Sequence, residues 1–185
     1  RNRHSHGRPF WSARNAGCEK FIKNKDTKVN AETLYPYEVV QKAHANFWSH
    51  IEDVDRVAVG KYWDNLPNYF GDSENSILPI VDTSASMLWG SSKTATPIDV
   101  AVSLGIYAAE RNKGPFYNHY ISFSRHPRLV TIEGADFVDK VRRIVESNVC
   151  ENTDLPAVFD LLFNLIKSGE AKVEDLPKTL VVISD

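Results

Sequence analysis

Three separate segments carry side-chain oxygen atoms at positions where a parallel sheet would bring them together. Asp82-Thr-Ser-Ala-Ser86 directly follows an apolar run, Thr153 lies in a polar stretch before a predicted helix, and Asp185 directly follows the last apolar run. Hard divalent cations prefer oxygen ligands, and magnesium takes six of them in octahedral geometry. The sequence therefore predicts a site for Mg²⁺ or Mn²⁺, without catalytic residues, whose ligands are Asp82, Ser84, Ser86, Thr153 and Asp185.

The charge of this ligand set indicates what the site would bind. Two carboxylates balance a divalent cation, and the hydroxyl groups stay neutral, so the metal keeps its attraction for an outside anion. We therefore expect a protein partner that supplies a carboxylate. An Asp-x-Ser-x-Ser pattern is by itself a weak signal. The alternative interpretation is that Asp82 is a turn or cap residue and that both serines are ordinary loop residues.

The strands and helices that must position these residues can be predicted from the sequence from residue 77 onward. Apolar runs predict strands at 77–81, 118–123, 128–132 and 180–183, although Pro79 is unusual for a central strand. Amphipathic patterns predict helices at 96–111, 135–147 and 154–167. The short link at 124–127 predicts a hairpin. This order is typical of an open, largely parallel α/β sheet, which binds ligands at the carboxyl ends of its strands.

Residues 1–76 differ in character from the rest of the chain. They are polar and rich in aromatic residues, and helices are predicted at 36–51 and 52–63. We expect the aromatic side chains to pack against the α/β core, with a base-stacking platform as the alternative. The predicted organisation is an N-terminal helical extension over 1–76 and an α/β domain over 77–185.

Composition excludes several classes of protein. The 185 residues include 22 basic and 24 acidic side chains, which give a net charge of −2 and exclude a strongly basic nucleic-acid-binding module. No apolar run approaches the roughly 20 residues that span a bilayer. Two isolated thiols, Cys18 and Cys150, form neither a disulfide framework nor a zinc cluster, so we expect a reducing, cytoplasmic location. The chain ends suggest a piece of a longer polypeptide.

The residues singled out above resemble a known site. Asp82-Thr-Ser-Ala-Ser86, Asn152-Thr-Asp154 and the final Val-Val-Ile-Ser-Asp185 resemble the metal-ion-dependent adhesion site (MIDAS) of von Willebrand factor A-type domains. Residues 77–185 resemble more narrowly the A-type domain of the TROVE group, which includes the Ro ribonucleoprotein, and most of all its plant, fungal, bacterial and viral relatives. The segments that carry this likeness are Ile77–Met87, Thr96–Ala101, Ile121–Pro127 and Asn152–Asp160.

The resemblance implies a Rossmann-like, mostly parallel sheet flanked by helices, with magnesium held directly or through water by the five residues named above. It also implies further strands and helices after Asp185, so we expect the domain to lack its last strands and its terminal strand to be an exposed edge prone to self-association. The loop before Thr153 has Glu151-Asn152 where the relatives usually carry glycine. The helical ring that holds RNA in Ro proteins is absent from this sequence.

Three functions follow as hypotheses. The first is a non-enzymatic, metal-dependent module for protein interaction within a larger assembly. The second is an RNA-binding scaffold of Ro type, for which the candidate residues are Lys20, Lys23, Lys25 and Lys28, unless that cluster is only a solvated face. The third, a metal-dependent phosphohydrolase, is disfavoured because aspartyl-phosphate enzymes carry a second acid two residues after the nucleophile, and that residue here is Ser84.

Overall fold

The computed structural model describes residues 16–24, 26–45, 51–71, 76–88, 95–147 and 152–185, without the side chains of 16–19 and 45. Four strands form one sheet: β1 (Ile77–Val81), β2 (His119–Ser122), β3 (Arg128–Thr131) and β4 (Thr179–Ile183). The helices are α1 (Ala16–Lys23), α2 (Pro36–Ala45), α3 (Asp53–Asp64), α4 (Pro97–Arg111), α5 (Phe137–Glu146) and α6 (Leu155–Lys167), with short 3₁₀ turns η1 (Ala85–Leu88) and η2 (Val173–Asp175).

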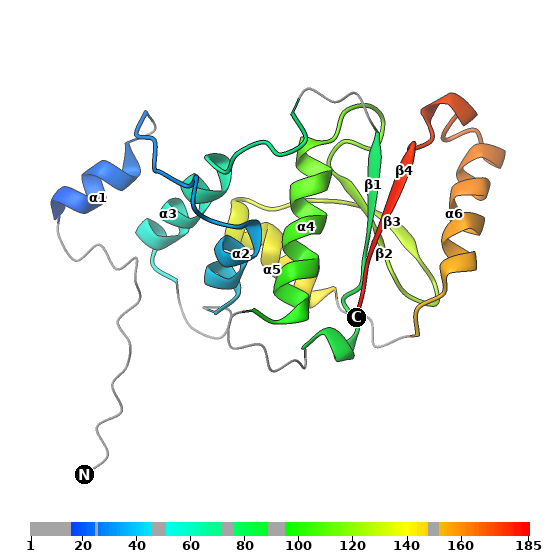
Figure 1. Cartoon of the computed structure of the whole chain (residues 1–185), viewed down its shortest axis with the longest axis horizontal. Helices are drawn as coiled ribbons and strands as arrows, with labels where there is room; N and C mark the ends of the chain where they lie inside the picture. Colours follow the sequence, from blue (N-terminus) through cyan, green and yellow to red (C-terminus); the bar gives the residue numbers. More distant parts are fainter. Residues whose placement is uncertain (1–15, 25, 46–50, 72–75, 89–94, 148–151) are drawn as a thin grey trace, which may run out of the picture.

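The sheet has the strand order β3-β2-β1-β4 and is mostly parallel (Figure 1). β1 pairs in parallel with both β2 and β4, and β2 pairs antiparallel with β3. The predicted α/β class and the predicted hairpin are therefore confirmed. In such a sheet the carboxyl ends of β1, β2 and β4 lie at one edge, which we call the carboxyl edge.

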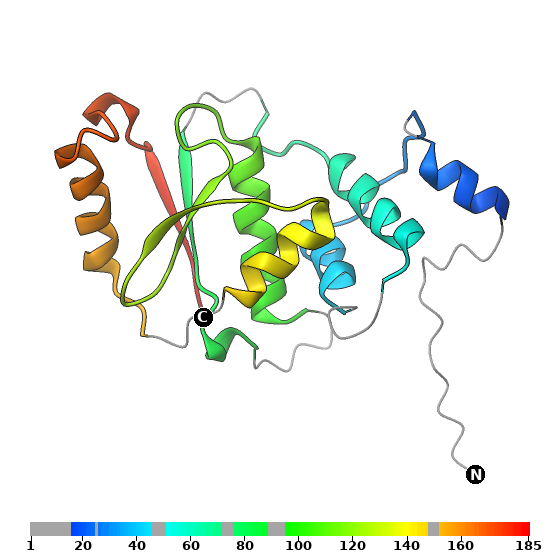
Figure 2. The same cartoon turned by 180° about the vertical axis from the view of Figure 1, so that it is seen from behind.

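Helices cover the two faces of the sheet unequally. α4 and α6 lie on opposite sides of it, as Figures 1 and 2 both show. α6 contributes Val158 and Leu162 to a buried cluster with Leu78 and Ile80 of β1. The other face carries a larger cluster, in which α4 and α5 pack together with residues of α2 and α3. Gly105 brings α4 against β1, because a Cβ atom there would lie 2.5 Å from a methyl group of Val81.

The N-terminal helices contribute to this larger cluster. Val39 and Val40 of α2 are fully buried within it. Trp63 of α3 is also buried and stacks on Phe137 at 4.3 Å between ring centroids, so the expected packing of the aromatic residues is confirmed for Trp63. Tyr69 differs, since 60% of it is exposed. Trp11, Phe47 and Trp48 lie outside the described residues.

Several sequence expectations need correction or completion. α2 is described from Pro36 to Ala45, and 46–50 lie outside the described residues. Ile51 is buried but not helical, so the helix predicted over 36–51 is wrong at Ile51. α1 was not predicted.

Pro79 lies within β1, in the middle of the sheet. The register between β1 and β2 starts only at Ile80, so the side of Pro79 that lacks an N–H faces the part of β2 that does not pair with β1.

Capping residues mark the start of the two helices nearest the carboxyl edge. Thr96 and Asp99 form a capping box at the first turn of α4, with Pro97 as its first residue. Asp154 caps α6 by accepting a hydrogen bond from the backbone N–H of Ala157 at 3.1 Å. These caps fix the loops that precede both helices.

Within the described residues, no helix has the length and apolar character needed to cross a membrane.

Candidate functional site

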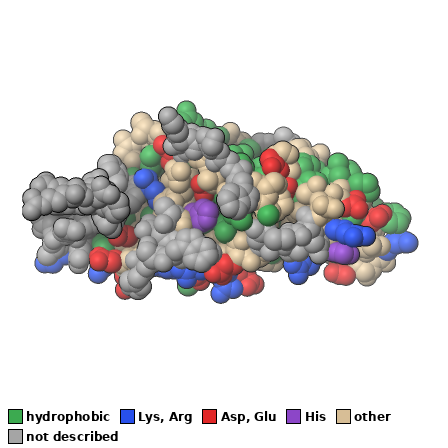
Figure 3. Space-filling view, turned by 90° about the horizontal axis from the view of Figure 1, so that it is seen from below, with side chains coloured by type: hydrophobic (Ala, Val, Ile, Leu, Met, Phe, Trp, Pro, Cys, Tyr) green, Lys and Arg blue, Asp and Glu red, His purple; other side chains and the backbone are tan. Residues whose placement is uncertain are grey.

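The ends of β1 and β4 form the centre of the candidate site. The backbone N–H of Asp82 donates to the carbonyl oxygen of Ile183 at 3.0 Å, so Asp82 and the residues after Ile183 leave the sheet side by side. A pocket of about 370 Å³ opens there, at the edge that Figure 3 views from below. Its walls are formed by Asp82, Ser84, Ala85, Ser86, Asn152, Thr153, Ser184 and Asp185.

The carboxylate of Asp82 is the most buried polar group of this pocket. Asp82 is only 1% exposed. One carboxylate oxygen accepts the backbone N–H of Ser84 at 2.8 Å, and the other accepts the hydroxyl of Ser184 at 2.6 Å. No Lys, Arg or His side chain among the described residues forms an ion pair with it. A buried carboxylate without a cation is unfavourable, so this site attracts positive charge.

Hydroxyl groups connect the two strand ends across the pocket. The hydroxyl oxygens of Ser84 and Ser86 lie 3.0 Å apart. The hydroxyl of Ser86 in turn donates to the carboxylate of Asp185 at 3.1 Å. Oxygen atoms from the loop after β1 are thus already in contact with the residue that follows β4, although 99 positions separate Ser86 from Asp185 in the sequence.

The third wall comes from the loop before α6. Thr153 and Asn152 line the pocket from there, and the cap formed by Asp154 fixes the chain immediately after them. All five residues predicted as ligands therefore lie in the wall of one pocket. Their role as metal ligands stays a prediction.

Two residues of the pocket were not identified from the sequence. The hydroxyl of Ser184 donates to the carboxylate of Asp82, and Asn152 lines the pocket together with Thr153. The sequence shows that Ser184 lies between the last strand and Asp185. The direction in which its side chain points, however, depends on the register between β1 and β4. Asn152 belongs to the segment Asn152-Thr-Asp154 singled out above, but it was not predicted as a ligand.

The donor set fits a hard divalent cation. A carboxylate has about four lone-pair sites, and Asp82 uses two of them for Ser84 and Ser184, so it retains capacity for a cation. The remaining donors are neutral hydroxyls and the exposed carboxylate of Asp185. The described residues contain no group of three or more His, Cys, Asp or Glu side chains suited to a metal. A cation in this pocket would therefore depend on hydroxyl and water oxygens as well as on two carboxylates.

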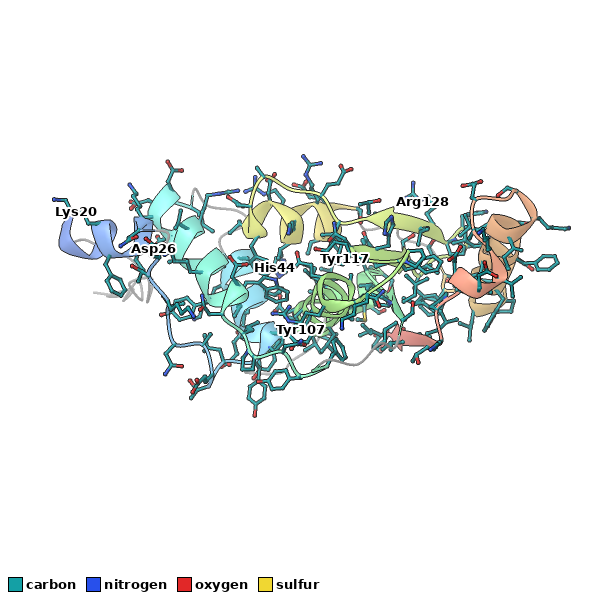
Figure 4. The ribbon with its side chains drawn as sticks, turned by 90° about the horizontal axis from the view of Figure 1, so that it is seen from above. Lys20, Asp26, His44, Tyr107, Tyr117 and Arg128 are labelled. Atoms are coloured by element: carbon teal, nitrogen blue, oxygen red, sulfur yellow. The ribbon has the colours of Figure 1, made fainter. Side chains whose placement is uncertain are left out.

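The lysines considered for RNA lie elsewhere. Lys20 and Lys23 are exposed on α1, and Lys28 is exposed in the segment that follows. Figure 4 places Lys20 at the far end of the molecule from the sheet. Lys25 lies outside the described residues. Lys20, Lys23 and Lys28 are not part of the pocket wall.

A second polar cluster joins α2 to the start of α4. Nδ1 of His44 lies 2.7 Å from the carboxylate of Asp99, which is buried, and the hydroxyl of Thr96 donates to the same carboxylate at 2.7 Å. Figure 4 shows His44 beside α4. Burial raises the pKa of Asp99, but the hydrogen bonds from His44 and Thr96 outweigh it and hold this pKa below its ordinary value. We interpret this cluster as structural.

Comparison with known proteins gives a family but no activity. The model of the family described as "Domain of unknown function (DUF7788)" matches residues 75–185. The chain is also similar to "Uncharacterized protein L728" of Acanthamoeba polyphaga mimivirus, at 28% identity over 161 residues. This match covers 86% of the chain but 26% of the viral protein, so the chain spans about a quarter of that relative's length. No solved structure matches the chain.

Proposed function

The chain belongs to the DUF7788 family, and we propose that its pocket is a metal-dependent binding site through which an acidic group of a protein partner is held. We further propose that residues 77–185 form a von Willebrand factor A-type domain, that the pocket is its metal-ion-dependent adhesion site, and that the domain acts within a larger assembly. The strand order and the meeting of three loops at the carboxyl edge support this proposal.

One observation carries the proposal. Asp82 is buried, its carboxylate faces a pocket of hydroxyl groups, and no described basic side chain neutralises it. In a structural polar cluster the buried acid normally has a basic partner, as Asp99 has His44. A metal ion would supply the missing charge in the pocket.

Each residue of the site would then have a distinct part. Asp82 and Asp185 would supply the two negative charges, and the hydroxyls of Ser84, Ser86 and Thr153 would supply neutral oxygens. Ser184 would hold the Asp82 carboxylate in place by its hydrogen bond.

The charge balance explains the choice of partner. Two carboxylates neutralise a divalent cation without a surplus, so the bound ion would still attract an outside carboxylate. An exposed Asp or Glu side chain of another protein is a ligand of this kind. The bound metal would supply Lewis-acid attraction for that group, and no bond need be made or broken.

A calorimetric titration tests the metal site. We expect the 185-residue chain to bind Mg²⁺ and Mn²⁺, and we expect Asp82→Ala to weaken binding at least about 100-fold, because a charged ligand and its hydrogen-bonded surroundings are lost together. Glu174→Ala is the matched control, since it removes an exposed carboxylate near the start of β4, at the other edge of the sheet.

Circular dichroism of both variants would establish that the fold is retained. Equal metal affinity of the wild type, a folded Asp82→Ala variant and the control would contradict the proposal. Absence of binding to the wild type would contradict it as well.

A further inference from the structure

The turn between β2 and β3 lies at the carboxyl edge, on the β2 side of the pocket. The backbone N–H of Phe123 donates to the carbonyl oxygen of Val81 at 2.9 Å, so the chain that leaves β2 starts beside Asp82. Figures 1 and 2 show this turn at the same edge of the sheet as the C-terminus, near the start of α6. The further strands expected after Asp185 would extend the sheet at β4, on the other side of β1, and would leave this turn exposed.

Two arginines in this turn have no acidic partner. Arg125 and Arg128 are exposed, as is His126 between them. Neither arginine forms an ion pair with any described residue, whereas Arg56 and Arg143 do. Figure 4 shows Arg128 at the outer margin of the molecule. The turn therefore presents positive charge to an outside group.

Serine hydroxyls hold the turn in one shape. Ser124 is buried, and its hydroxyl oxygen accepts the backbone N–H of His126 at 3.2 Å. The hydroxyl oxygen of Ser122 accepts the backbone N–H of Arg128 at 3.1 Å. Pro127 restricts the backbone further. Because the turn is ordered before a partner arrives, binding loses less conformational entropy there.

We propose that Arg125 and Arg128 form a second contact for the acidic partner of the pocket, and that this partner is an extended protein segment with several acidic residues. This contact rests on the function proposed above, since one carboxylate of the segment binds the metal while others bind the arginines. Two guanidinium groups match carboxylates well, because each presents paired N–H donors to both oxygens.

The spacing between the pocket and the turn suits one extended segment. Val81 pairs with Ser122, and Arg125 follows Ser122 by three positions. The backbone of Arg125 therefore lies at most about 15 Å from Val81, since strands are about 5 Å apart and each residue adds at most about 3.5 Å. An extended chain covers that distance in about five residues. Acidic side chains about five positions apart would reach both the metal and the arginines.

Charge favours a protein segment over a nucleic acid. The chain has a net charge of −2, and the pocket itself contains the carboxylates of Asp82 and Asp185. A nucleic acid presents a continuous row of phosphates, and binding it without sequence preference takes several basic residues along the backbone. Two arginines beside an acidic pocket instead fit a few separate carboxylates.

Fluorescence anisotropy with a fluorescein-labelled octa-aspartate peptide tests the contact. We expect the 185-residue chain, saturated with Mg²⁺, to bind this peptide but not its octa-asparagine counterpart. The double variant Arg125→Glu with Arg128→Glu should weaken peptide binding at least about tenfold, because two attractive charges become repulsive. Lys113→Glu is the matched control, since it reverses an exposed charge beyond the end of α4, at the opposite edge of the sheet, and should leave peptide binding unchanged.

Calorimetric titration of the double variant with Mg²⁺ separates failure of this contact from failure of the metal site. Its Mg²⁺ affinity should stay within about threefold of the wild type, because neither arginine lines the pocket and solvent screens exposed charges. Circular dichroism of each variant would establish that the fold is retained.

Three outcomes would overturn the proposed contact while the metal site stands. These are a metal-bound wild type that does not bind the aspartate peptide, equal peptide binding by the wild type and the double variant, and tighter binding of octathymidylate than of the peptide. A wild type that does not bind Mg²⁺ would instead overturn the proposed function itself, and this contact with it.

Discussion

Asp82 occupies an unusual position for an acidic residue, because its carboxylate is buried but accepts hydrogen bonds only from uncharged groups. Ser184 supplies one of these bonds and Ser84 the other. If a metal binds here, Ser184 acts on it only through Asp82. Supporting bonds of this kind fix the direction of a ligand and raise its affinity for a metal.

Ser184→Ala should therefore weaken Mg²⁺ or Mn²⁺ binding about tenfold, since it frees one oxygen of Asp82 without removing a ligand. The measurement is the same calorimetric titration used for Asp82→Ala. Ser168→Ala, which removes an exposed hydroxyl at the end of α6, serves as the control. Unchanged affinity in Ser184→Ala would show that the bond to Asp82 has no part in metal binding.

The sequence placed five residues of this pocket correctly but could not reveal Ser184. The five were found because they directly follow strands or precede a helix, and parallel strands end at a common edge. The direction of Ser184 depends on the pairing of Val81 with Ile183, which joins residues 102 positions apart. No local pattern encodes such a register.

Among the helices, α5 is both capped and joined to α3 by a single residue, Asp136. Asp136 caps its first turn by accepting the backbone N–H of Asp139 at 2.9 Å. It also accepts two hydrogen bonds from the guanidinium group of Arg56 in α3, at 2.7 and 2.8 Å. A helix of the α/β part is thus joined to a helix of the N-terminal part by the residue that starts it.

Substitutions of Asp136 should separate these contributions. Asp136→Asn keeps a capping side chain but loses the ion pair, so it should lower the free energy of unfolding by about 0.5–1 kcal/mol. Asp136→Ala loses both and should lower it by about 2 kcal/mol. Urea denaturation measures the difference. Equal effects of the two substitutions would contradict a capping role for Asp136.

Most helices and strands from residue 77 onward were predictable, but those of the N-terminal part were less so. Thr96, Pro97 and Asp99 mark the start of α4 in the sequence itself. The predicted helix over 36–51 is wrong at its last residue, because the apolar spacing continues to Ile51 although Ile51 is not helical. Ile51 is buried as a non-helical residue by contacts with other elements, which the spacing of residues does not reveal.

At the scale of the whole molecule, contacts between basic side chains of the N-terminal helices and acidic side chains of the α/β part join these two parts of the described chain. His44 contacts Asp99 of α4, and Arg56 contacts Asp136. Burial raises the pKa of Asp136, but the hydrogen bond from Arg56 and that from the backbone of Asp139 outweigh it, so this pKa lies below its ordinary value. The pKa of Asp99 is lowered in the same way by His44 and Thr96.

These lowered pKa values predict loss of stability in acid. Unfolded Asp has a pKa of about 3.9, so below about pH 5 the unfolded chain takes up protons that folded Asp99 and Asp136 resist. The stabilisation is complete above that range and disappears as the pH falls through the two folded-state values. Urea denaturation from pH 7 to pH 3 should show a shallower decline in the free energy of unfolding for Asp136→Asn than for the wild type, by no more than about 1 kcal/mol over the whole range, because this carboxylate is partly exposed and its ion pair is screened by solvent. Identical slopes would contradict this account.

The central claim is that the pocket at the carboxyl edge binds a divalent cation. Its most direct test is an anomalous difference map from crystals of the chain grown with Mn²⁺. The account predicts a peak inside the pocket, among the oxygen atoms of Asp82, Ser84, Ser86, Thr153 and Asp185. An empty pocket at a saturating concentration of Mn²⁺, or a peak only at exposed carboxylates elsewhere, would contradict it.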